Sequence, residues 1–198
     1  MSHLRKLSYF LVLDTSYSME SSWGILNSKL LDHLERLNHW KDQKSEMVLD
    51  ISLSTFNQDF FLNRPTSDFG QAKAILEKVQ PEGQSALYDA LGTVLQMIYQ
   101  EVKQENIETT YWMLCFFTDA RDNCSVHCQP NQINELLKKI NFFNSSTRFK
   151  GVVLGTMPEG LTGMECLNLE ESSPSFPEEL MLSFSYLENL VVQIFSKS

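Results

Sequence analysis

The sequence lacks any long apolar run and any excess of basic residues. No segment approaches the ~18 consecutive apolar residues that suggest a membrane span, so we expect no membrane association. Lysine and arginine number 16 against 25 aspartates and glutamates, and the resulting net charge of −9 opposes binding to the phosphate backbone of nucleic acid. There is also no internal repeat or extended low-complexity tract. We therefore expect a soluble protein with a single domain over residues 1–198.

Cysteine is scarce, with four residues in the chain. Cys115 falls within an apolar run, where a small buried side chain is expected. Cys124 and Cys128 flank His127 in a polar stretch, but a structural zinc site needs four ligands and usually two separated pairs. The spacing therefore favours free thiols in a loop over a zinc site.

The N-terminal segment lacks the features of a cleaved signal. Arg5 and Lys6 precede the apolar run Leu7–Leu13, which stops at Asp14 without a small-residue cleavage site. The run is therefore interpreted as a first strand, and we expect a cytoplasmic protein.

Apolar, β-rich runs alternate along the chain with longer segments of helical period, and this alternation predicts an α/β fold with crossover helices between parallel strands. The expected strands are Leu7–Leu13, Met47–Phe56, Asp59–Leu62, Tyr111–Thr118, Arg148–Leu154 and Cys166–Leu169. The expected helices are Ser18–Asn38, Asp68–Val79, Ala86–Lys103, Pro130–Phe143 and Pro177–Phe195. The two most apolar strands, the first and the fourth, are typical of central strands that helices cover on both faces.

Oxygen-bearing side chains follow both of these central strands. Asp14, Ser16 and Ser18 stand at alternate positions where the first strand turns into a helix, and Asp119 follows the fourth strand. In an open α/β sheet, ligands bind outside the carboxyl ends of the strands. If the two strands are neighbours, Asp119 faces the Asp14 loop, and Ser85 at the start of the next helix supplies a third group.

These five residues offer hard oxygen ligands that suit Mg²⁺, with Mn²⁺ or Ca²⁺ as other candidates. Mg²⁺ prefers octahedral oxygen coordination, keeps several waters and is commonly held by one or two carboxylates. Neutral hydroxyl ligands leave positive charge on the ion, and that charge can attract a carboxylate from another protein. The pattern therefore favours a binding site over a catalytic one.

The three motifs together resemble those of von Willebrand factor type A domains. The resemblance rests on D-x-S-x-S at Asp14, G-x-S-A-L-Y-D-A-L around Ser85 and T-D-x-x-D-N at Asp119, and it spans nearly the whole chain. It implies a doubly wound, Rossmann-like and mostly parallel sheet with one short antiparallel edge strand, helices on both faces, and a metal-ion-dependent adhesion site (MIDAS) at its top.

The resemblance also implies roles for the five residues and a class of partner. Ser16, Ser18 and Ser85 match direct hydroxyl ligands, whereas Asp14 and Asp119 match carboxylates that often act through water. The expected partner is another protein that contributes an Asp or Glu side chain. The sequence departs from the family pattern at Ser85, where threonine is usual, at Gln84, where glycine is frequent, and at Ala120, where glycine is common.

Three other interpretations use the same residues. Asp14, Ser16, Ser18 and Ser85 can act as helix caps, which leaves a metal-independent interaction scaffold as the serious alternative. Gly83-Gln84-Ser85 begins like the nucleophile elbow of a serine hydrolase, but no strand directly precedes it and Leu87 stands where glycine is expected. A nucleotide-binding enzyme is disfavoured because the first strand–helix turn has no glycine-rich phosphate motif. The expectation is a binding module and not an enzyme.

Overall fold

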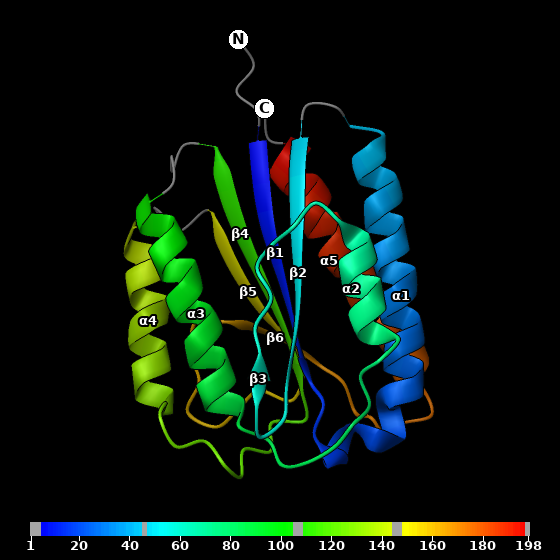
Figure 1. Cartoon of the computed structure of the whole chain (residues 1–198), viewed down its shortest axis with the longest axis vertical. Coiled ribbons are helices and arrows are strands. Elements are labelled where there is room, and N and C mark those ends of the chain that lie inside the picture. The colour runs from blue at the N-terminus through cyan, green and yellow to red at the C-terminus, as the bar shows by residue number, and fades with distance from the viewer. Residues whose placement is uncertain (1–4, 45–46, 105–108, 144–147, 197–198) are drawn as a thin grey trace.

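The computed structural model describes residues 5–44, 47–104, 109–143 and 148–196, and their central feature is a six-stranded sheet. The strand order is β3-β2-β1-β4-β5-β6, and all neighbouring pairs are parallel except β2 with β3 (Figure 1). The strands are β1 Arg5–Asp14, β2 Met47–Phe56, β3 Phe60–Phe61, β4 Thr110–Thr118, β5 Phe149–Gly155 and β6 Glu165–Asn168. The predicted fold class is confirmed, including the short antiparallel edge strand.

Helices cover both faces of this sheet, with α1, α2 and α5 on one face and α3 and α4 on the other (Figure 1). Their bounds are α1 Glu20–Asp42, α2 Phe69–Leu76, α3 Leu87–Gln104, α4 Pro130–Phe143 and α5 Phe176–Ser196, and a single 3-10 turn, Tyr17–Met19, precedes α1. Helix α1 is longer than its apolar period predicts. In its last turn the Trp40 ring packs against Phe195 of α5, with the ring centroids 5.5 Å apart.

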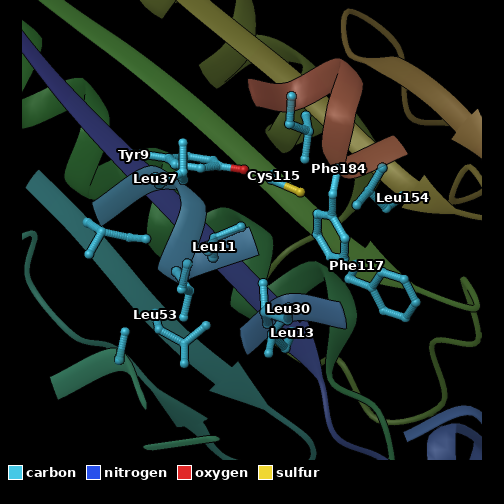
Figure 2. Close-up of a cluster of buried hydrophobic side chains, with 14 of the residues drawn as sticks. Tyr9, Leu11, Leu13, Leu30, Leu37, Leu53, Cys115, Phe117, Leu154 and Phe184 are labelled. Carbon is cyan, nitrogen blue, oxygen red and sulfur yellow. The ribbon is translucent and has the colours of Figure 1, made fainter. Parts of the chain in front are cut away.

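The core consists of two apolar layers, one on each face of the sheet, and β1 contributes side chains to both. Successive side chains of a strand point to opposite sides of a sheet, so alternate residues enter different layers. Leu11 and Leu13 pack under α1 and α5, as Figure 2 shows, whereas Phe10 and Val12 pack under α3 and α4. This double burial explains why the strand is apolar almost throughout.

Strand β1 pairs with β2 on one side and with β4 on the other, so the two most apolar strands are neighbours, the condition for Asp119 to face the Asp14 loop. Leu13 lies opposite Phe117, so Asp14 and Thr118 are the next residues on adjacent strands. The chain leaves β1 toward one face of the sheet and β4 toward the other, which makes this point a topological switch. The segments that follow β1 and β4 therefore lie side by side at the carboxyl ends of the strands.

Candidate metal-binding site at the carboxyl ends of the strands

Asp14 is the centre of the hydrogen-bond network at this end of the sheet. Its Oδ2 accepts hydrogen bonds from Thr118 Oγ1 at 2.9 Å and from Ser85 Oγ at 3.2 Å, and its Oδ1 accepts one from the Ser16 backbone N–H at 3.0 Å. The side chain is fully buried. Three segments far apart in the sequence therefore bond to one carboxylate, and two of the predicted site residues, Asp14 and Ser85, are in direct contact.

The surroundings of Asp14 disfavour its negative charge. Burial raises the pKa of its carboxyl above the ordinary value, hydrogen bonds from Ser16 and Thr118 oppose that rise, and the charge of Asp119 adds to it. A buried carboxylate with a second carboxylate close by is stabilised by a cation between or beside them. The charge of Asp119 is thus close enough to affect the Asp14 carboxyl.

Ser16 and Ser18 form a pair of hydroxyls beside Asp14, with their Oγ atoms 3.0 Å apart. Ser16 is buried and precedes the 3-10 turn, yet its side chain makes no capping hydrogen bond. The loop itself is fixed to its neighbours, because Thr15 donates to Phe56 O through both its backbone N–H (2.7 Å) and its Oγ1 (2.9 Å). The two hydroxyls therefore lie on a turn that is attached to the end of β2.

Ser85 is held beside this cluster by hydrogen bonds with the loop that follows β4. Its N–H donates to Asn123 Oδ1 at 2.8 Å, and its carbonyl oxygen accepts from the backbone N–H groups of Asn123 and Cys124. The loop before it is attached to the Asp14 loop, since Glu82 N–H donates to Thr15 O at 2.7 Å. Ser85 is buried, so its hydroxyl has one principal direction, toward Asp14.

Residues other than Ser85 cap the start of helix α3, although the sequence had made Ser85 a candidate cap. The Leu87 N–H donates to Asp122 Oδ1 at 2.9 Å, and Ser125 Oγ accepts from the N–H groups of Tyr88 (3.0 Å) and Asp89 (3.2 Å). Asp122 therefore satisfies a backbone donor at the start of the helix. The Ser85 hydroxyl is left for Asp14.

Asp119 stands apart from this hydroxyl network. Its Oδ1 accepts from the Arg121 backbone N–H at 3.0 Å, and its Oδ2 pairs with Arg121 Nε at 3.2 Å. The carboxylate is 14% exposed and lines a pocket of about 600 Å³ that Ser18 and Arg121 also line. Because the Arg121 side chain is 75% exposed, this ion pair is a weak competitor for the carboxylate.

The backbone around Asp119 is unusual at two positions. Ala120 has φ 64°, a left-handed conformation that favours glycine, and this is the position where the sequence departs from the family's glycine. Gly155 has φ 111°, and a Cβ there would collide with the Thr118 carbonyl oxygen. Gly155 pairs with Thr118 across β4 and β5 and lines the pocket together with Asp119.

Two contributors to the site were missed from the sequence. Thr118 donates to Asp14 and also accepts from the Ala120 N–H at 3.0 Å, although the sequence analysis gave it no role. Its place directly before Asp119 at the end of an apolar strand was the available signal. Glu171 lines the same pocket as Asp119 from the loop between β6 and α5, and nothing local in its Glu- and Ser-rich surroundings distinguishes it.

The donor set at this end of the sheet fits a hard divalent cation better than zinc. It consists of hydroxyl and carboxylate oxygens, which suit Mg²⁺, Mn²⁺ and Ca²⁺. Over the residues that the structure describes, no three His, Cys, Asp or Glu side chains gather as a metal-binding group. This argues against a zinc site at Cys124, His127 and Cys128. A site with two carboxylates and several serine hydroxyls contains only two side chains of those four types, so the same observation does not bear on it.

A hydrolase mechanism finds no support in the position of Ser85. Its hydroxyl donates to a buried carboxylate, whereas His127 lies on the exposed loop whose backbone N–H groups bond to Asp89. The segment before Ser85 is a loop that follows α2, not the strand that a nucleophile elbow requires.

No protein-family model and no curated protein match this chain. Solved structures with the same fold do exist. The PilB minor pilin from Streptococcus sanguinis matches 96% of this chain with a TM-score of 0.60 and 12% identity. Proximal thread matrix protein 1 from the mussel byssus matches 91% of it with a TM-score of 0.54 and 15% identity, and a further structure of that protein has a zinc-occupied MIDAS motif.

Because the identities are low, these similarities establish the fold alone. This chain spans 62% of the pilin and 46% of the mussel protein, so both neighbours are considerably longer. Their names refer to a pilus and a byssus, which gives the predicted cytoplasmic location no support. Within the described part of the chain, none of the helices is long and apolar enough to cross a membrane.

Proposed function

We propose that this chain is a protein-binding module that holds a divalent cation, Mg²⁺ in the first place, at the carboxyl ends of β1 and β4. In this proposal a partner protein supplies an Asp or Glu side chain to the ion. The observation that carries it is the convergence of Ser85 and Thr118 hydroxyls on the buried Asp14 carboxylate, next to the Ser16–Ser18 hydroxyl pair.

The proposed division of roles follows from burial and charge. Ser16, Ser18 and Ser85 supply neutral oxygens, and Asp14 and Asp119 supply the two negative charges. The ion would offset the electrostatic cost of burying Asp14 close to Asp119. A cation with mostly neutral ligands retains the charge that attracts a partner's carboxylate.

The similar solved structures support this proposal in two respects. One neighbour carries a MIDAS motif that holds a divalent metal, which agrees with the motif resemblance of Asp14, Ser85 and Asp119. A pilin and a thread matrix protein are also proteins of assemblies, which favours a protein partner over a small-molecule substrate. A binding function without catalysis is therefore the function that we assign.

The first prediction concerns metal binding itself. Calorimetric titration with Mn²⁺ should give one site in the unaltered chain, and Asp14→Asn should weaken binding by at least about tenfold, the lower end of the loss caused by removing groups that support a metal site. Asparagine keeps the shape and an acceptor for Ser16, so the change tests the charge. Asp32→Asn, which removes an equally negative but exposed residue of α1, is the matched control and should bind Mn²⁺ normally.

A metal-independent scaffold is the second candidate, and the Asp119–Arg121 ion pair is the observation that favours it. In that case the hydrogen bonds at Asp14 and the pair at Asp119 are complete without an ion. An absence of Mn²⁺ binding by the unaltered chain would contradict the metal-dependent function and leave the scaffold.

A further inference from the structure

Two exposed apolar side chains lie on segments that adjoin the candidate metal site. Tyr17 stands between the two serines of the Ser16–Ser18 pair and is 66% exposed, whereas Val126 lies in the loop that follows β4 and is 76% exposed. A single exposed apolar side chain is ordinary on a protein surface. These two differ from that ordinary case in what they adjoin and in how their segments are held.

Both side chains belong to segments that are bonded to the chain around Ser85. The Tyr17 N–H donates to Gly83 O at 3.1 Å. Two residues further on, Ser85 O accepts from the Asn123 N–H at 3.1 Å, in the loop that also carries Val126. The turn with Tyr17 and the loop with Val126 are therefore attached to the same short segment, whose serine hydroxyl donates to the buried carboxylate of the site.

One carboxylate of helix α3 fixes the loop that carries Val126. Asp89 Oδ2 accepts from the Val126 N–H at 2.9 Å, and its Oδ1 accepts from the N–H groups of His127 at 2.9 Å and Cys128 at 2.6 Å. Three consecutive backbone donors are thus satisfied within the chain itself. Because the loop is held in this way, little conformational entropy is lost when a partner packs against Val126.

We infer that Tyr17 and Val126 are the apolar contacts that select the partner, and that the acidic residue of the partner is flanked by apolar side chains. This inference rests on the proposed function, in which the acidic residue reaches the ion, and it adds the residues beside it. Tyrosine is enriched among the residues that contribute most to binding, because its ring offers a large contact area. The net charge of −9 disfavours a partner with further acidic residues around the first.

The test uses two short, fluorescently labelled peptides, each with one central glutamate. In one peptide leucines flank the glutamate on both sides, and in the other peptide serines take their places. Fluorescence anisotropy in the presence of Mg²⁺ should show at least about tenfold tighter binding of the leucine peptide to the unaltered chain, since burial of a single leucine side chain is enough for that ratio.

Two substitutions assign the preference to these side chains. Tyr17→Ser and Val126→Ser should each weaken binding of the leucine peptide at least about fivefold. Both variants should bind the serine peptide, and Mn²⁺ in calorimetry, as the unaltered chain does. Val192→Ser is the matched control, because it removes a 39% exposed valine near the opposite end of the molecule, in the last turns of α5. It should change none of these affinities.

The outcomes separate this inference from the function on which it rests. Equal affinity of the two peptides for the unaltered chain, binding of neither peptide, or leucine-peptide binding that survives both substitutions would overturn the inference. Failure of the metal-dependent function gives a different result. The leucine peptide then binds the unaltered chain equally well with EDTA and with Mg²⁺, and its dependence on Tyr17 and Val126 remains.

Discussion

At the scale of single residues, Asp14 shows how one buried charge organises a site. Its carboxylate accepts from residues of three segments, and its pKa is raised chiefly by burial. Desolvation of this kind costs free energy that hydrogen bonds offset only in part. A residue placed at such a cost is a candidate for function, and a cation is the group that would compensate for it.

Ala120 offers a direct test of backbone strain beside the site. A left-handed conformation costs a non-glycine residue about 1–2 kcal/mol, whereas glycine loses roughly 0.5–1 kcal/mol through its greater freedom in the unfolded chain. Ala120→Gly should therefore raise the free energy of unfolding by roughly 0.5–1 kcal/mol. Urea denaturation measures this difference.

The matched control for this prediction is Ala74→Gly in helix α2, where the same substitution should lower the free energy of unfolding by roughly 0.5–1 kcal/mol. Equal destabilisation at both positions would show that residue 120 is not strained in the folded protein.

At the scale of elements, His33 links α1 to both β1 and α5. Its Nε2 lies 3.2 Å from Tyr9 Oη, its Nδ1 lies 2.8 Å from Glu188 Oε1, and its ring stacks on Phe184. A neutral ring with hydrogen on Nδ1 satisfies both contacts, donating to Glu188 and accepting from Tyr9. The polar contacts of this fully buried side chain thus fix how α5 lies against α1.

This arrangement predicts a pH dependence of stability. Burial lowers the pKa of His33 below its ordinary value of 6.5, Glu188 opposes that shift, and Arg36 adds to it. The unfolded chain therefore binds the proton first, so the stabilisation from neutral His33 is complete above pH 6.5 and is lost as pH falls from 6.5 toward the lower folded-state pKa. The unaltered chain should lose stability over that interval.

His33→Gln serves to isolate this effect in urea denaturation at pH 7.5 and 5.5. The variant should be less stable at pH 7.5 by about 1–3 kcal/mol, because buried polar groups lose partners. Its deficit should shrink at pH 5.5, where the unaltered chain has lost part of the stabilisation from His33. A deficit that grows at pH 5.5 would mean that the charged ring is favoured beside Glu188.

Most elements could be predicted from the sequence because their signals are local. β2 and α4 have the predicted bounds, since apolar periodicity and a starting proline define them. The closeness of the Asp14 and Asp119 segments was also predictable, because the parallel strands β1 and β4 end at one edge of the sheet. The position of Glu171 was not, since it depends on how β6 and α5 pack, and no sequence period reports that.

At the scale of the whole molecule, the two apolar layers and the site have a common origin in β1. The strand is buried on both faces and pairs with β2 and β4, so the sheet itself fixes the position of its carboxyl end. At the other end of the sheet, Arg5 donates to the carbonyl oxygens of Ile194 and Phe195 and fastens the end of α5. The first turn of α5, at the opposite end of the helix, is the part that lies nearest the pocket.

The central claim is that one divalent cation binds where the Asp14, Ser85 and Asp119 segments meet. Anomalous diffraction from crystals grown with Mn²⁺ locates such an ion directly. The account predicts a single strong peak within direct coordination distance of Ser16 Oγ and Ser18 Oγ, absent from crystals of Asp14→Asn grown in the same way. A strong peak elsewhere on the molecule, or none at this position with Mn²⁺ in excess, would contradict the claim.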